Sequence, residues 1–294
     1  MQGQELLFQR NYPAAIELFQ KIEQEYPASP AGAFGQMASY QLMMFENLDF
    51  RFRTKYETSE RRFEKVVLQM LSGKPKSFDL FVAGAGYGMR GFYYIRDGRW
   101  VRAVGSAVRA VQLLKRAAFV DKEFLDARLG IGMYNYWRSA LTKGLYFLPF
   151  FSDHRAEGIE DIKQVVDNGR FANKLAKANL AFIYSEEHRH LDAQKALEPF
   201  LQEYPNNIIL RQLSGRLYMW LRQYDKSLQE FEKILKIDPS MTKTYFYMGV
   251  VMMRKPGFSV LATKYFEDFL ATNPEKEWAE AAHKNLKILH QKTS

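Results

Sequence analysis

Residues 208–241 read IILRQLSGRLYMWLRQYDKSLQEFEKILKIDPSM, and the small, aromatic and proline residues of this stretch recur along the chain. The interval is 34 or 35 residues, and each matched set holds one type of side chain: Pro205, Pro239 and Pro274; Ala181, Gly215 and Gly249; Ala193, Ser227 and Ala262; Leu197, Phe231 and Phe266. A constant period of this length indicates stacked copies of one structural unit. The pattern predicts regular repeats over 174–207, 208–241 and 242–276.

The residue types within a repeat suit two antiparallel helices. Small side chains allow two helix backbones to approach to about 8–10 Å where the helices cross. A proline after the second helix prevents that helix from continuing. The period and these residues resemble the tetratricopeptide repeat (TPR), and the resemblance implies an all-α superhelix, or solenoid.

The same template extends over the rest of the chain in less regular form. It predicts a partial first repeat, whose first helix is expected to begin before Met1, then three irregular repeats and a C-terminal capping helix: 1–29, 30–72, 80–118, 123–168 and 277–291. The expectation is therefore a single TPR solenoid over 1–294, with about six to seven helix pairs.

The middle of the chain resembles a narrower group. Leu129–Tyr136 is a Gly-rich helical segment, Leu145–Pro149 is apolar, and Asp153–Ile159 opens the next helix with a charged pair. These segments are similar to bacterial TPR proteins that are distantly related to the eukaryotic inclusion-body clearance (TTC39-type) proteins. The resemblance implies architecture and is nearly silent on biochemistry.

Composition excludes several classes of protein. The chain has 294 residues, 47% of them apolar, and it contains no cysteine. Disorder, disulfide scaffolds, thiolate zinc sites and cysteine nucleophiles are excluded. Apolar runs such as 145–151 are far shorter than the roughly 20 residues of a membrane helix. Because the first repeat is incomplete, we expect the bacterial cell envelope, periplasmic or membrane-associated, with the cytoplasm as the alternative.

The net charge of +9 is concentrated in one region. Residues 51–120 have a net charge of +10, and the remaining chain has −1. Within this region Arg99, Arg102, Arg109 and Arg116 fall on one stripe of a helix. Such a basic stripe could bind an acidic peptide, an anionic lipid head group or nucleic acid, or it could be an ordinary solvated face. Nucleic acid is the weakest option, because no known binding module accompanies the charge.

An apolar insertion interrupts the repeat over 123–168. It spans 144–151, where a short polar connection would be usual. Its large side chains are Leu145, Tyr146, Phe147, Phe150 and Phe151. Two readings stay open: the insertion folds back over the superhelix, or it docks a partner or a membrane surface.

Motifs with catalytic or metal-binding chemistry are weak. Gly86–Gly91 has the spacing GxGxxG, but it falls inside the repeat pattern and no acidic residue follows at the ribose-binding distance. Glu186–His190 offers two histidines on a predicted turn, and a stable metal site usually needs three or four ligands. We therefore expect no catalytic residues, no cofactor and no bound metal.

The expected function is that of a non-catalytic scaffold or adaptor, which holds a segment of a partner protein in the concave groove of the superhelix. The repeat period places these candidate groove residues there: Tyr184, Arg211, Tyr218, Tyr245 and Met252. Alternatives are an envelope protein that holds a lipid or other apolar ligand in the groove, and an unrecognised enzyme. The partner is expected to be a protein or peptide, possibly acidic, and peripheral contact with a membrane is a further option.

Overall fold

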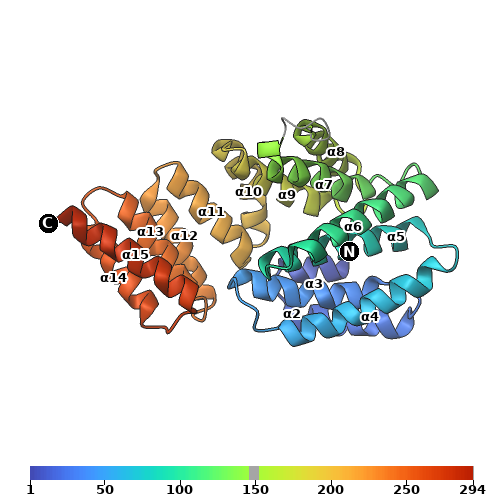
Figure 1. The fold of residues 1–294 in the computed structure, drawn as a ribbon, viewed down its shortest axis with the longest axis horizontal. Helices are drawn as coiled ribbons and strands as arrows, with labels where there is room; N and C mark the ends of the chain where they lie inside the picture. Colours follow the sequence, from blue (N-terminus) through green and yellow to red (C-terminus); the bar gives the residue numbers. More distant parts are fainter. Residues whose placement is uncertain (146–151, 294) are drawn as a thin grey trace. The chain divides into compact units, whose positions relative to one another are not determined.

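The computed structural model describes residues 1–145 and 152–293. The described part of the chain is all-α (Figure 1). The first eight helices are α1 (Gln2–Phe8), α2 (Tyr12–Glu25), α3 (Ala31–Glu46), α4 (Arg53–Leu71), α5 (Ser77–Arg96), α6 (Trp100–Val120), α7 (Ala127–Leu141) and α8 (Arg155–Asn168). The others are α9 (Asn173–Glu186), α10 (His190–Glu203), α11 (Ile208–Trp220), α12 (Tyr224–Ile237), α13 (Lys243–Arg254), α14 (Ser259–Leu270) and α15 (Lys276–Thr293), with a short 3₁₀ helix η1 (Lys143–Leu145).

Helices α1 to α14 follow one another as pairs, and α15 comes last, which confirms the predicted number of pairs and the terminal helix. The first helix of the first pair is the short α1, over residues 2–8. Gly3 of α1 lies against the ring of Phe19 in α2, so the first pair closes around an aromatic side chain.

The chain divides into two compact units. Unit 1 comprises Met1–Met44 and Phe50–Leu180, and unit 2 comprises Phe45–Asp49 and Ala181–Ser294. The short segment 45–49, which comprises the end of α3 and the residues after it, thus belongs to unit 2, where its backbone accepts two hydrogen bonds. Gln212 donates to the carbonyl of Glu46 at 2.6 Å, and Lys243 donates to the carbonyl of Leu48 at 3.1 Å.

In unit 2 the repeat positions do what the pattern predicts. Ala193, Ser227 and Ala262 are completely buried. A Cβ atom added to Gly215 would lie 2.8 Å from the ring of Phe231, and one added to Gly249 would lie 2.8 Å from the ring of Phe266. The phenylalanine of the second helix therefore fills the space that a side chain on the first helix would need.

The turns between paired helices share a backbone conformation. His188 and Arg222 have φ of 57° and 58°, and Gly257 has φ of 80°. These residues lie 34 and 35 positions apart. Each of these three turns therefore places its equivalent residue in the left-handed region, although only the last of the three uses glycine there.

Unit 1 is closed by contacts between distant segments. Glu5 in α1 forms an ion pair of 3.2 Å with Lys174 in α9. The carboxylate of Asp126, almost fully buried, accepts backbone hydrogen bonds from residues 170–172 at 2.7–3.2 Å. Nearby, the rings of Phe78 and Phe124 pack on Phe171. The start of α9 is thereby fixed to earlier parts of the unit.

At the crossing of α7 and α8 in unit 1, two glycines face each other. A Cβ atom on Gly132 would lie 2.5 Å from the carbonyl oxygen of Gly158, and a Cβ atom on Gly158 would lie 2.5 Å from that of Gly132. Both obstacles are backbone atoms, so a rotamer change cannot relieve them.

We expect Gly132→Ala to lower the free energy of unfolding by about 1–3 kcal/mol, because α7 and α8 must move apart. Gly88→Ala in α5 is the matched control, since its new methyl group would meet no atom within 4 Å. That substitution should raise stability by about 0.5–1 kcal/mol. Chemical denaturation measures both, and equal effects of the two variants would contradict the tight crossing.

Candidate partner-binding surfaces

The five predicted groove residues fall into two groups. Tyr184, Tyr218 and Tyr245 are half-buried. The guanidinium of Arg189 lies 4.3 Å above the ring of Tyr184, and the ammonium of Lys226 lies 5.7 Å from the ring of Tyr218. These tyrosines reach the surface of unit 2 and are available for contacts.

Arg211 and Met252 are buried instead. Met252 is 1% exposed and belongs to the apolar core of unit 2. Arg211 pairs with the carboxylate of Glu230 at 2.7 Å and donates to the carbonyl of Pro205 at 2.5 Å. Lys233 completes the group at 2.7 Å from Glu230. Both side chains therefore hold helices together inside unit 2, and neither is placed to meet a partner.

Unit 2 has a shallow hollow that the sequence reasoning missed. It is lined by Phe45, Leu48, Phe182, Ile209, Gln212, Arg216, Phe231 and Tyr247. The lining is mostly apolar, and Arg216 is its only charged member. Phe182 and Arg216 lie 34 residues apart, so the repeat period relates them. The predicted pair Tyr184 and Tyr218 lies two positions further along the same helices.

The electrostatics of the hollow are set by Arg216. This side chain is exposed at the rim, on α11. Burial raises the pKa of Tyr247, and the positive charge of Arg216 opposes that rise. The hydroxyl of Tyr247 therefore remains a neutral hydrogen-bonding group at physiological pH, and the positive charge of Arg216 is available to an anion.

The basic stripe does not act as one set. Arg99 pairs with Asp97 and, at 3.4 Å, with Glu57, and it stacks at 4.6 Å on the ring of Tyr94. Arg109 forms a hydrogen bond with Tyr87. Arg102 and Arg116 are exposed on α6. Arg102 and Arg116 are therefore open to solvent, whereas Arg99 and Arg109 are held by neighbours in α4 and α5.

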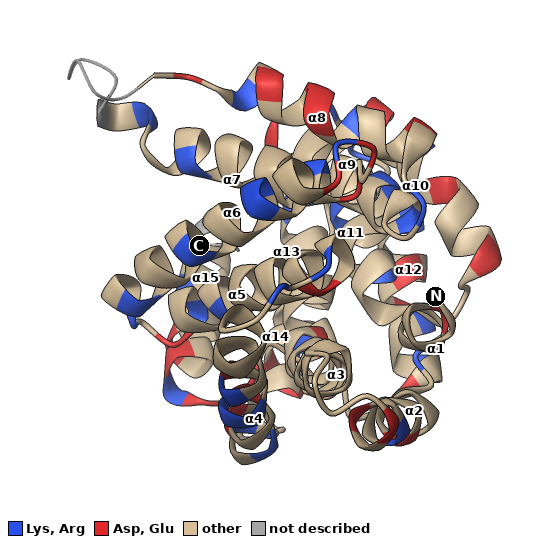
Figure 2. Cartoon of the chain, turned by 90° about the vertical axis from the view of Figure 1, so that its right-hand side faces the viewer, with Lys and Arg blue, Asp and Glu red and all other residues tan. Residues whose placement is uncertain are grey.

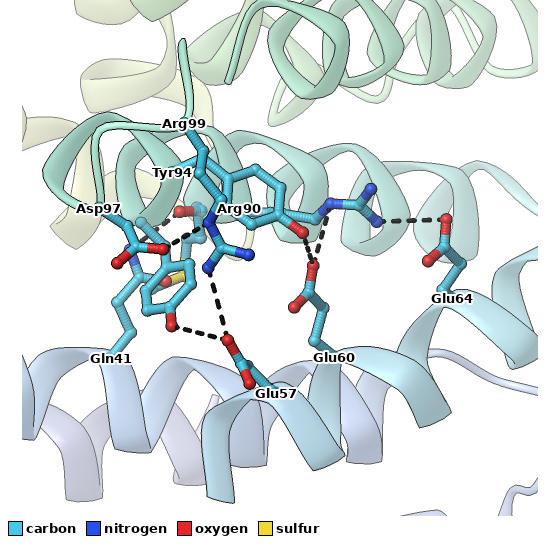
Figure 3. A network of polar contacts seen from close by, with 10 residues as sticks. Gln41, Glu57, Glu60, Glu64, Arg90, Tyr94, Asp97 and Arg99 are labelled. Carbon is cyan, nitrogen blue, oxygen red and sulfur yellow. Dashed lines mark hydrogen bonds and ion pairs between the residues drawn. The ribbon is translucent and has the colours of Figure 1, made fainter. Parts of the chain in front are cut away.

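A polar network between α4 and α5 accounts for much of the charge near the stripe (Figure 3). Glu57, Glu60 and Glu64 lie along one face of α4. Arg90 of α5 bridges Glu60 at 3.1 Å and Glu64 at 3.2 Å, and Tyr94 donates to Glu60 at 2.5 Å. Burial, followed by the hydrogen bond to Glu60, raises the pKa of Tyr94. The network therefore neutralises Arg90 of α5 and Arg99, which precedes α6.

The apolar insertion is largely outside the described residues. Tyr146, Phe147, Phe150 and Phe151 lie in the segment 146–151, and Leu145 ends η1. The charged pair that follows is described. Arg155 binds both carboxylate oxygens of Asp153, which lowers the pKa of Asp153 to about 2.

His188 and His190, the two histidines of the predicted turn, lie in a backbone turn and against an aromatic ring. His188 occupies the left-handed turn described above, and the ring of His190 is stacked 5.9 Å from that of Trp220. Burial, followed by the nearby His188, lowers the pKa of His190. Across the described ranges, no three His, Asp or Glu side chains converge as metal ligands. Over the same ranges, no helix is long and apolar enough to span a membrane.

Gly86, the first glycine of the GxGxxG stretch, lies within α5 and against the ring of Phe63 from α4. The motif is therefore helical and packed, unlike a dinucleotide-binding loop, which follows a strand.

Comparison with known proteins supports the architecture. No protein-family model and no curated protein matches the sequence. Among solved structures, human IFIT1 as a dimer with PPP-AAAA is 15% identical, with a TM-score of 0.51 over 95% of this chain and 69% of that one. A monomeric IFIT1 mutant with Gppp-AAAA is 16% identical, with a TM-score of 0.51 over 95% of this chain and 68% of that one.

The fold is a TPR-like helical repeat. A third solved structure is the C-terminal part of a TPR repeat-containing protein from Cytophaga hutchinsonii. It is 18% identical, with a TM-score of 0.37 over 98% of this chain and 93% of that one. The likeness to the two IFIT1 structures concerns the fold, and at such identities it assigns no partner.

We expect Arg211→Ala to lower the free energy of unfolding by about 3 kcal/mol, because Glu230 would lose its buried partner. The loss falls at the lower end of the range for broken buried pairs, since Lys233 remains. Arg216→Ala on the same helix removes an exposed arginine and should change stability by less than about 0.5 kcal/mol. Thermal and chemical denaturation measure the stability of both variants. An Arg211→Ala protein as stable as the wild type would rule out the structural role of Arg211.

Proposed function

We propose that the protein is a non-catalytic scaffold that binds a segment of a partner protein in the hollow of unit 2. The observation that carries the proposal is the lining itself, in which apolar side chains surround one exposed arginine. TPR-like folds present such surfaces on successive helices of the array. A bacterial envelope location, and the narrower resemblance of the middle of the chain, remain part of this proposal.

The lining specifies the kind of segment that fits. Phe182, Ile209 and Tyr247 offer apolar contacts from three different helices. Arg216 offers a guanidinium that can bind a carboxylate through two hydrogen bonds. The expected segment therefore has a large apolar side chain close to an Asp, a Glu or a chain terminus.

A peptide-display selection on the purified protein tests this. Selected peptides should pair an aromatic or aliphatic residue with an acidic one. Arg216→Glu should weaken the best peptide about 10- to 100-fold, because it replaces a charged hydrogen bond with repulsion. Lys264→Glu, an exposed charge reversal on α14, is the control and should bind as the wild type does. Fluorescence anisotropy measures the affinities.

Two results would contradict the proposal. If the selected peptides bind the Arg216→Glu and Lys264→Glu proteins with equal affinity, the binding site lies outside the hollow. Preferential binding of the RNA PPP-AAAA, a ligand solved with IFIT1, would replace the protein partner by a nucleic acid.

A further inference from the structure

Helix α6 has an unusual solvent face. Its 21 residues read WVRAVGSAVRAVQLLKRAAFV and include no acidic residue. Figure 2 shows Lys and Arg along this helix and no Asp or Glu. The inner side is ordinary core, where Ala103, Leu114 and Ala117 are buried.

Large apolar side chains project outward from the same helix. Val101 is 89% exposed, Val104 is 63% exposed and Phe119 is 81% exposed, and Val108 is also exposed. At 3.6 residues per turn, these four positions fall within about 60° of one another around the helix axis. They form one ridge, which we call the valine ridge.

Cations flank the valine ridge. Arg102, Arg109 and Arg116 follow one another at intervals of seven residues and lie about 100° from the ridge around the helix axis. Of these, Arg102 and Arg116 are exposed, and Arg109 is half-buried. Lys115 is exposed within the ridge itself. Trp100, which is 59% exposed, stands at the first turn of the helix. Aliphatic, aromatic and basic side chains thus share one exposed face about 30 Å long.

We propose that this face of α6 is a docking surface for an anionic lipid bilayer. Side chains of this mixture suit the boundary between head groups and acyl chains, where valine and phenylalanine enter the apolar layer and tryptophan lies at head-group depth. Arginine and lysine beside them meet lipid phosphates. Unlike a free amphipathic helix, α6 is already folded against α5 and α7, so docking costs little ordering entropy.

Charge complementarity decides among the possible occupants. A second copy of the chain would bring two acid-free, basic faces together, and their like charges would repel. Nucleic acid would use the cations but gain little from the valines, because single strands are bound by stacking on aromatic rings. A bilayer with anionic lipids uses both the cations and the aliphatic side chains.

Vesicle flotation of the whole protein tests the docking surface. The probes are vesicles of phosphatidylcholine alone and of an equimolar mixture of phosphatidylcholine and phosphatidylglycerol. Binding is expected to the mixed vesicles, and binding to the neutral ones should be much weaker. Raising the salt concentration should weaken binding to the mixed vesicles, because it screens the lipid charge.

Two double variants separate the contributions of charge and apolar contact. Arg102→Gln with Arg116→Gln should weaken binding to mixed vesicles about 25-fold, at about fivefold per cation. Val101→Ser with Val104→Ser should weaken it about tenfold, through lost apolar burial. Lys236→Gln with Lys264→Gln removes two exposed charges from unit 2 and should leave binding within about twofold. Circular dichroism melting confirms that each variant is folded.

Three outcomes would overturn the proposal. One is an absence of binding to the mixed vesicles. The second is loss of vesicle binding in the arginine variant but not in the valine variant, together with binding of the wild-type protein to heparin as strong as its binding to the mixed vesicles. That result would indicate a general polyanion site. The third is concentration-dependent self-association without lipid that the valine variant abolishes. None of them bears on the hollow of unit 2, because Arg216 takes no part in this surface.

Discussion

The close approach of the two helices within a pair is the constraint on which the rest of the structure depends. In unit 2 a glycine in the first helix receives the phenylalanine ring of the second, as Gly215 does with Phe231. In unit 1 the same problem is solved at α7 and α8 by two facing glycines. Either solution fixes the register of a pair, because a shift by one residue would bring a Cβ atom against a ring or a carbonyl.

In this packing, charged residues lie either between neighbouring helices or on the solvent face of a helix, and unit 1 has both. On the inner side of α4, three glutamates neutralise Arg90 and Arg99, so part of the positive charge of 51–120 is compensated within unit 1. Helix α6 contributes four cations and no acidic residue, and its exposed arginines, Arg102 and Arg116, present their positive charge to solvent. Helix α6 therefore carries four of the 15 lysines and arginines of 51–120 and none of the acidic residues of that region.

The repeat period predicted the helix pairs and the small residues at their crossings, because both follow from local spacing. It could not predict which equivalent positions face outward. Tyr184 and Tyr218 are equivalent, and so are Phe182 and Arg216, but the two sets differ by about 200° around the helix. The burial of Arg211 depends on Glu230 in the next helix, and the hollow uses Phe45 from a distant segment. Neither relation leaves a periodic signal.

The valine ridge was missed for a different reason. In sequence, valines at 101, 104 and 108 have the spacing of a helix's core-facing stripe, so periodicity assigns them to the interior. Alanine and leucine at 103, 110, 114 and 117 have the same kind of spacing and are the residues that are buried. A helix with two apolar stripes can bury only one against its neighbours in a two-layer array. The stripe that is left outside is the one next to the arginines, and this pairing of apolar and basic side chains gives the face of α6 its preference for an anionic, apolar surface.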